Sequence, residues 1–174
     1  EEKNIKKIYL SIKKKFKEKN FEIIYVDDDS LDGTQNEILK LSKKEANIRY
    51  IFRKNDKDLS RSFIAGLNIS KSKYVILMDC DLQHDPQILN KLYSSIQAKN
   101  VQCVSGSRFM KKSINNTKKV KYIFRLTLSR ILNYLINFFL NINLTDPLTG
   151  IFIIERKIFL IGKKKLYLNG YKIF

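Results

Sequence analysis

The sequence predicts an α/β fold in which a mostly parallel sheet carries helices on both faces. Short apolar runs rich in Ile, Val and Tyr alternate with amphipathic segments along the first hundred residues. Polar loop residues end most of these runs. Because parallel strands need crossover connections, such alternation favours strands joined by helices. With 174 residues and a hydrophobic content of 44%, we expect a single domain spanning residues 1–174.

Spacing and turn residues predict each element in order. Ile5, Ile8, Ile12 and Phe16 recur at helical spacing, with lysines on the opposite face, so the chain opens with an amphipathic helix. Residues 21–26 form an apolar, β-branched run that ends in an acidic loop, as a buried strand would. The elements expected next are helix Thr34–Lys44, strand Ile48–Phe52, helix Ser60–Ile69, strand Tyr74–Met78, helix Gln87–Ala98, strand Val101–Ser105, a long helix over Lys119–Asn141 and a mixed tail.

Composition narrows the class of partner and the compartment. The chain has 34 Lys and Arg against 17 Asp and Glu, a net charge of +17 that favours anionic partners. Cys80 and Cys103 are isolated, which indicates neither a disulfide framework nor a zinc site and favours a cytoplasmic setting. The apolar region Tyr122–Leu144 is interrupted by Arg125 and Arg130, so it fails the test for a membrane span but could lie on a membrane surface.

Two acidic clusters carry the candidate chemistry. The segments 27–32 and 79–85 each follow an expected strand, so the fold should bring them to one edge of the sheet. Asp79 and Asp81 leave their strand two residues apart, which favours side chains on the same side. Paired carboxylates attract Mg²⁺ or Mn²⁺. Ordinary loop residues or helix N-caps explain either cluster alone about equally well, and Asp85 before Pro86 fits a cap. The same acidic edge would repel a nucleic acid, which we do not expect as a partner.

Five segments, in this order and spacing, resemble a known family. They are VDDDSLDGT, MDCDLQHDP, SGSRF, DPLTGIFIIERKIF and NGYKIF. Together they resemble the family 2 glycosyltransferases and, within them, dolichol-phosphate mannosyltransferases and related polyprenyl-phosphate glycosyltransferases. The resemblance covers nearly the whole chain. Residues 1–5 look like the end of the family's opening segment, so we expect the domain to be truncated at both ends, with its first strand missing.

The resemblance implies a GT-A fold and a metal-dependent, inverting transfer of a single hexose, with mannose as the favoured sugar. The donor would be a nucleotide-diphosphate sugar, GDP-mannose or UDP-glucose, and the acceptor a dolichyl or polyprenyl phosphate. Mg²⁺ or Mn²⁺ would be the cofactor. The enzyme would be peripheral at the cytoplasmic face of a membrane, with membrane helices possible outside this sequence.

The resemblance also implies residue roles, carried over by motif position. The donor would contact Glu1, Val26, Asp28, Asp79, Cys80 (by its backbone), Asp81 and Lys172. The metal ligands would be Asp79, Asp81 and Gln83. The acceptor phosphate would meet Arg108, Arg125 and Ser129, and the catalytic residues would be Asp81, Arg108 and Asp146. Turn chemistry around Pro147 and Gly150 explains Asp146 nearly as well.

Alternatives remain at this point. Within the family, a polyprenyl-phosphate glucosyltransferase or another member fits, whereas a processive polysaccharide synthase would carry a Gln-x-x-Arg-Trp motif and this chain has no Trp. Outside the family, a receiver-like signalling domain imitates the strand ending in Asp27 and Asp28 followed by a later strand ending in Asp79. It would require a Lys-Pro near its last strand, which the sequence lacks.

Overall fold

The computed structural model describes two compact units. Within the chain it describes residues 1–16, 20–55, 57–82, 87–107, 120–141, 144–147 and 149–162. Glu1–Val104 and Ile151–Phe174 belong to unit 1, and Ser105–Gly150 to unit 2. The alternation of strands and helices lies in unit 1, and the longest described helix lies in unit 2.

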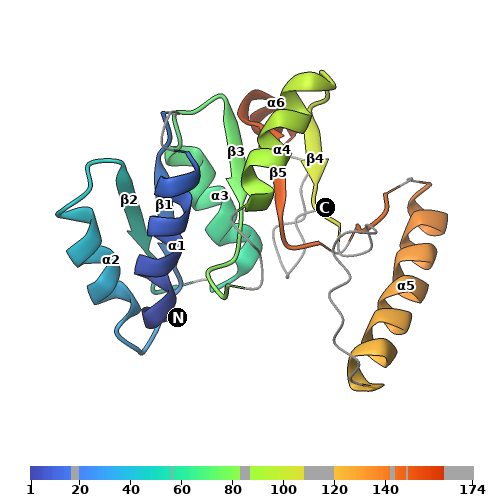
Figure 1. Ribbon diagram of the computed structural model, residues 1–174, viewed down its shortest axis with the longest axis horizontal. Helices are drawn as coiled ribbons and strands as arrows, with labels where there is room; N and C mark the ends of the chain where they lie inside the picture. Colours follow the sequence, from blue (N-terminus) through green and yellow to red (C-terminus); the bar gives the residue numbers. More distant parts are fainter. Residues whose placement is uncertain are drawn as a thin grey trace. The chain divides into compact units, whose positions relative to one another are not determined.

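Unit 1 follows the expected order of elements (Figure 1). Its elements are α1 (Glu2–Lys15), β1 (Ile23–Asp27), α2 (Thr34–Ser42), β2 (Ile48–Phe52), α3 (Leu59–Ile69), β3 (Tyr74–Leu77), α4 (Gln87–Ala98), β4 (Cys103–Ser105), β5 (Phe152–Glu155) and α6 (Arg156–Gly162). The first eight match the expected segments to within a few residues. The sequence pattern missed β5 and α6, because the four-residue strand passes directly into the helix with no turn residue between them.

Among the described residues the strands form two sheets, whereas the pattern predicted one mostly parallel sheet. β1 and β2 are parallel, in a register from Ile23 opposite Ile48 to Asp27 opposite Phe52. The second sheet has the order β3-β5-β4, and β5 runs antiparallel to β3. The mostly parallel prediction therefore holds for the first sheet, and the unexpected tail strand supplies the antiparallel pair of the second.

Helices cover both faces of these sheets, as predicted. Successive residues of the tail strand enter different clusters: Ile151 and Ile153 pack with α4 residues, whereas Phe152 and Ile154 pack with residues of α3 and α6. A third cluster places α1 and α2 on one face of the parallel pair; its buried members are Ile5, Tyr9, Tyr25, Ile38 and Ile48. The opposite face of β1 meets α3, where a Cβ on Gly66 would lie 3.1 Å from Val26. The absence of a side chain at Gly66 permits this close approach.

Unit 2 is dominated by α5 (Val120–Leu140). Three asparagines, Asn133, Asn137 and Asn141, recur every four residues in a row along this helix and at its end. In the structure they have a structural role. Asn133 and Asn137 donate side-chain hydrogen bonds to the carbonyl oxygens of Thr145 (3.4 Å) and Leu144 (2.8 Å). Asn141 has a φ of 49°, a conformation that Asn tolerates well, directly after the helix. The row therefore ends the helix and holds the returning chain against it.

α5 also exposes several large apolar side chains. Phe138 and Phe139 are 69% and 76% exposed. Leu128, Ile131, Leu132, Tyr134 and Leu135 are exposed as well. Within the described residues, no helix combines the length and apolarity that crossing a membrane requires.

Candidate active site

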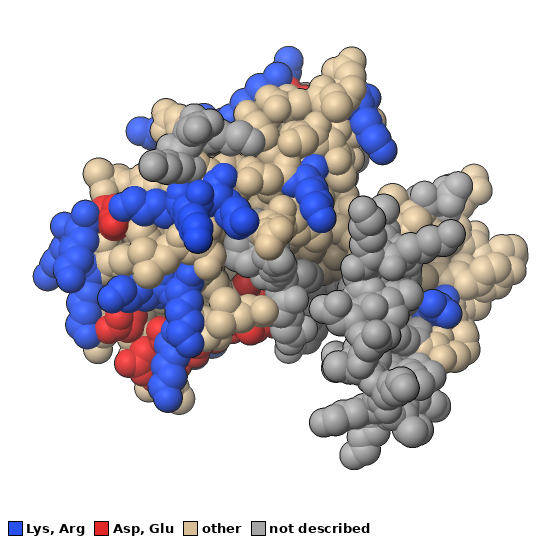
Figure 2. Space-filling view, in the orientation of Figure 1, with Lys and Arg blue, Asp and Glu red and all other residues tan. Residues whose placement is uncertain are grey.

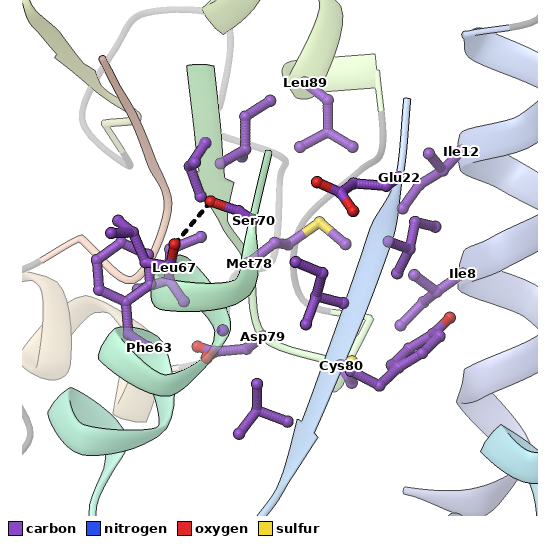
Figure 3. A pocket seen from close by; sticks show the side chains of 18 of the residues that line it. Ile8, Ile12, Glu22, Phe63, Leu67, Ser70, Met78, Asp79, Cys80 and Leu89 are labelled. Atoms are coloured by element: carbon purple, nitrogen blue, oxygen red, sulfur yellow. Dashed lines mark hydrogen bonds between the residues drawn. The ribbon is translucent and has the colours of Figure 1, made fainter. Parts of the chain in front are cut away.

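The two acidic clusters meet at one cavity of unit 1. A cavity of about 960 Å³ lies between β1 and β3, and Asp27, Asp28, Asp79 and Asp81 are among its lining residues. Figure 3 shows its side chains between the ribbons of these strands. These aspartates lie at or just after the carboxyl ends of β1 and β3 and line the same cavity. The prediction that the two clusters share an edge is therefore confirmed.

Asp27 is a buried carboxylate held by its own loop. It accepts hydrogen bonds from the backbone nitrogen of Ser30 (3.0 Å), the Ser30 hydroxyl and the Gln35 amide (2.7 Å). Burial alone would raise the pKa of Asp27, but these hydrogen bonds outweigh it and lower the pKa below its ordinary value. Asp27 is thus ionised, and its carboxylate holds the acidic loop in shape.

Asp28 is oriented by an arginine that the sequence analysis missed. Arg53 donates to the Asp28 carboxylate at 3.0 Å, and the backbone nitrogen of Asp58 donates to it at 2.9 Å. The same guanidinium also contacts the Asp58 carbonyl and the Ser62 hydroxyl. A usable signal was present: Arg53 directly follows β2, and a parallel neighbour of β1 must end beside Asp27 and Asp28.

Asp79, Cys80 and Asp81 continue from β3 into the cavity. Figure 3 shows Asp79 extending toward α3 and Cys80 toward β1. The Cys80 carbonyl accepts a hydrogen bond from the Asn4 amide (3.2 Å), while burial raises the pKa of the Cys80 thiol to about 12. The thiol is therefore neutral and unreactive, which agrees with a role for Cys80 through its backbone alone.

The donor set suits a hard divalent cation. In the part of the chain that the structure describes, no three His, Cys, Asp or Glu side chains gather closely enough to hold a metal by themselves. Asp79 and Asp81 nevertheless supply two carboxylates to one cavity. Mg²⁺ in nucleotide sites is typically bound by one or two carboxylates plus substrate phosphates, so two carboxylates fit such an ion.

The remaining predicted residues are distributed between the two units. Glu1 and Val26 line the cavity with Asp28. Ser129 is half-buried on α5, and of Arg125 the structure describes the helical backbone only. Three predicted residues lie outside the described residues: Gln83, Arg108 and Lys172.

Asp146 is fully buried in unit 2. Its carbonyl accepts a hydrogen bond from the backbone nitrogen of Thr149 (3.2 Å), which closes a turn over Pro147. Asp followed by Pro at the first two positions is typical of such turns. The backbone at Asp146 thus has the structural role that the sequence offered as the alternative, and its catalytic role stays a prediction.

The acidic edge is local, despite the net charge of +17. In Figure 2, Lys and Arg spread widely over the visible face of unit 1, while Asp and Glu gather mainly toward one edge of it. Such a distribution attracts an anion to the protein as a whole and a cation to the edge.

Three curated proteins are similar to parts of this sequence. Dolichol-phosphate mannosyltransferase from Saccharomyces cerevisiae is 40% identical over 78 residues, which cover 45% of this chain and 29% of the relative. Its namesake from Pyrococcus furiosus is 35% identical, covering 64% of this chain and 31% of the relative. The one from Mycosarcoma maydis is 28% identical over 159 residues, covering 88% and 51%. The chain therefore spans about half, or less, of the length of these relatives.

Solved structures and a family match agree with them. Glucosyl-3-phosphoglycerate synthase from Mycobacterium tuberculosis, solved with Mn²⁺, uridine diphosphate and phosphoglyceric acid, superposes with a TM-score of 0.62 at 17% identity, covering 91% of this chain and 53% of that one. Residues 1–160 match the family described as Glycosyl transferase family 2, a span that includes both acidic clusters and removes the receiver-domain alternative. The chain belongs to glycosyl transferase family 2 and has the GT-A fold.

Proposed function

We propose that this chain is the catalytic part of an enzyme that transfers a single hexose from a nucleotide-diphosphate sugar to a dolichyl or polyprenyl phosphate. Mannose is the hexose that we propose, with glucose as the alternative. One observation carries the proposal: the carboxylates that follow β1 and β3 line the same cavity. Relatives named dolichol-phosphate mannosyltransferase support the choice of sugar and acceptor. The product is inverted because the acceptor displaces the nucleotide directly.

Each acidic cluster has its own task toward the donor. Asp28, fixed by Arg53 and the Asp58 backbone, accepts a hydrogen bond from the nucleoside, beside Glu1 and Val26. Asp79 and Asp81 would hold Mg²⁺ or Mn²⁺, with Gln83 and the diphosphate. The bound cation would neutralise the negative charge that develops on the departing β-phosphate.

The acceptor needs positioning more than activation. A phosphate monoester is already ionised near neutral pH, so no strong general base has to remove a proton from it. Arginine binds phosphate oxygens in pairs, and Arg108 and Arg125 are the arginines assigned to that task. Ser129 lies one helical turn beyond Arg125 on α5, so it can face the same phosphate. Lys172 would steady the donor phosphates.

The lipid acceptor requires contact with a membrane surface, and we propose that α5 makes this contact. Its exposed Phe138 and Phe139 would enter the headgroup boundary, as apolar faces of interfacial helices do. The chain's excess of Lys and Arg would add attraction to anionic lipids. We place the enzyme at the cytoplasmic face of the membrane, without a spanning helix among the described residues.

An assay of the full-length protein tests the proposal. Labelled GDP-mannose or UDP-glucose is incubated with polyprenyl phosphate and Mn²⁺, and the label in the chloroform phase is counted. Label from GDP-mannose supports the proposal as stated. Label from UDP-glucose alone keeps the reaction and changes the sugar to glucose. No chloroform-soluble label from either donor rejects the proposed acceptor.

A further inference from the structure

Leu82 holds a backbone conformation that leucine rarely adopts. Its φ is 63°, in the left-handed region, where the β-carbon of an L residue crowds a carbonyl oxygen. Glycine enters this region freely, whereas a leucine is disfavoured there by about tenfold in population. A bulky residue keeps such a conformation only where its surroundings impose it. The fold around Leu82 therefore requires a turn at this position.

The rest of the described chain uses this conformation at residues that tolerate it. Besides Leu82, the described residues other than glycine with positive φ are Asp29, Asn100 and Asn141. Asn and Asp enter the left-handed region more readily, because their short polar side chains form local hydrogen bonds. Asn100 and Asn141 follow the ends of α4 and α5, where left-handed residues are usual. Leu82 is the exception, and it directly follows Asp81.

Packing does not account for the conformation of Leu82. Its side chain is 43% exposed, and it belongs to none of the three hydrophobic clusters of the described residues. Burial of the leucine side chain therefore offsets little of the cost of the left-handed backbone. The backbone turn, and not the apolar side chain, is the feature that needs a function.

The turn lies between two fixed parts of unit 1. On the upstream side, the Cys80 carbonyl accepts a hydrogen bond from the Asn4 amide (3.2 Å). The side chains there still alternate as in a strand, since Asp79 extends toward α3 and Cys80 toward β1 (Figure 3). On the downstream side, α4 begins at Gln87. An extended residue after Asp81 would prolong the strand direction, whereas a left-handed residue turns the chain at that point.

The first acidic loop has the same construction. Asp29 also has a φ of 63°, and it directly follows Asp28, the carboxylate assigned to the nucleoside. Each acidic cluster thus places a left-handed residue immediately after a carboxylate that lines the cavity. Asp29 adopts this turn with little strain, whereas Leu82 adopts it against the preference of its residue type. The repetition indicates that the turn serves the carboxylates.

We propose that Leu82 is a positioning residue: its left-handed backbone turns the chain directly after Asp81 and so keeps the Asp81 carboxylate at the cation site. This inference rests on the proposed function, in which Asp79 and Asp81 hold Mg²⁺ or Mn²⁺. Strained backbone at a functional site is one way in which a protein fixes the geometry of that site before a ligand binds. Leu82 acts through Asp81 and contacts neither the cation nor the nucleotide.

Two substitutions separate the backbone of Leu82 from its side chain. Leu82→Val keeps an apolar residue but opposes the turn, because a β-branched residue tolerates positive φ poorly. Leu82→Asn removes the apolar side chain and favours the turn. The measurement is the calorimetric affinity of the full-length protein for GDP and for UDP, each in Mn²⁺ and in EDTA. The ratio of the affinities in Mn²⁺ and in EDTA reports the contribution of the cation.

We expect Leu82→Val to lower this ratio about tenfold and to leave the affinity in EDTA unchanged, because the competent turn becomes less populated. Leu82→Asn should keep the ratio or raise it. Leu31→Val makes the same substitution at an exposed leucine of the other acidic loop whose φ is not positive, and it should change nothing. Asn100→Val opposes a left-handed residue after α4, so it should lower the thermal midpoint by about 2–4 °C without changing the ratio.

Any other order of the variants overturns the proposal. A loss with Leu82→Asn but not with Leu82→Val would assign the role to the leucine side chain. Equal losses with both, or a loss with Asn100→Val, would show a general response to destabilisation. If Leu82→Val does not fold, Leu82→Asn decides alone: a ratio kept or raised supports the turn, and a lowered ratio overturns it. Failure of the proposed function has a different signature, since the unchanged protein would then show no Mn²⁺-dependent affinity for either nucleotide, and this inference would fall with it.

Discussion

The acidic edge of unit 1 and the helix α5 of unit 2 place their polar and apolar residues in opposite ways. Unit 1 buries its apolar residues in three clusters and presents carboxylates at a cavity. Among the α5 side chains that the structure describes, the buried one is polar, Asn133, while Phe138 and Phe139 are exposed. An edge of the first kind suits a cation and a diphosphate, and a helix of the second kind suits lipid. The contrast divides the proposed reaction into a donor half and an acceptor half.

The largest expected effect lies in the donor half. Asp81→Asn removes a charge that would stabilise the leaving diphosphate, so we expect transfer to fall about 1000-fold. The measurement is initial rate in the chloroform-extraction assay. Asp29→Asn is the matched control, since Asp29 in the other acidic loop forms an exposed ion pair with Lys57 (2.9 Å). Retention of more than a tenth of the rate by Asp81→Asn would remove this residue from the site.

The next effect would sharpen the acceptor half. Phe138→Ser combined with Phe139→Ser removes two exposed rings, and at about 1.5–3 kcal/mol for each ring buried in lipid, vesicle binding should weaken by more than about 100-fold. Co-sedimentation with anionic vesicles measures it. Leu10→Ser, on α1 of unit 1 and 51% exposed, is the control and should change nothing. Equal weakening by Leu10→Ser would erase the contrast between the units.

A smaller effect concerns the orientation of Asp28. Arg53→Ala removes the guanidinium that holds this carboxylate, so the KM for the sugar donor should rise about tenfold. The KM for the lipid acceptor should stay the same, and Arg53→Lys should restore part of the loss. Arg49→Ala, at the other end of β2 and paired with Glu22 (3.3 Å), is the control. A parallel rise in both KM values would show general loosening of the fold instead.

The smallest effect is a pH dependence within the first acidic loop. Hydrogen bonds lower the pKa of Asp27 below its ordinary 3.8, so its ionised form stabilises the fold. Because its pKa is lowered in the folded protein, the Asp27 carboxylate contributes its full stabilisation at pH values above 3.8, and this stabilisation is lost as the pH falls through the lowered pKa. We expect Asp27→Asn to unfold more easily by about 1 kcal/mol at pH 6 and by less at pH 3. Urea unfolding across this range checks it; a difference that grows toward acid would contradict the assignment.

Local patterns predicted most of unit 1 but could not predict its pairing. The acidic run after Val26 and the Asp-x-Asp after Met78 each marked a strand end, and the structure brings both to one cavity. The tail strand was missed because Phe152–Glu155 is short and is stabilised by distant partners on β3. Contacts of that kind leave no periodic trace in the sequence.

The site was predictable where chemistry follows directly from a motif. Asp28, Asp79 and Asp81 belong to such motifs, whereas Arg53 acts on Asp28 across 25 positions of sequence and only the parallel register brings it there. The asparagine row on α5 shows the opposite difficulty. Spacing placed Asn133 and Asn137 on one face, but only their hydrogen bonds to Thr145 and Leu144 reveal a structural role.

The account depends most on a cation held between the acidic edge and a nucleotide diphosphate. Calorimetric titration of GDP, and of UDP in parallel, into the full-length protein tests this directly. We predict binding at least tenfold tighter in Mn²⁺ than in EDTA for one nucleotide. Asp81→Asn should abolish that difference without unfolding the protein. Equal affinity in Mn²⁺ and EDTA for both nucleotides would contradict the account.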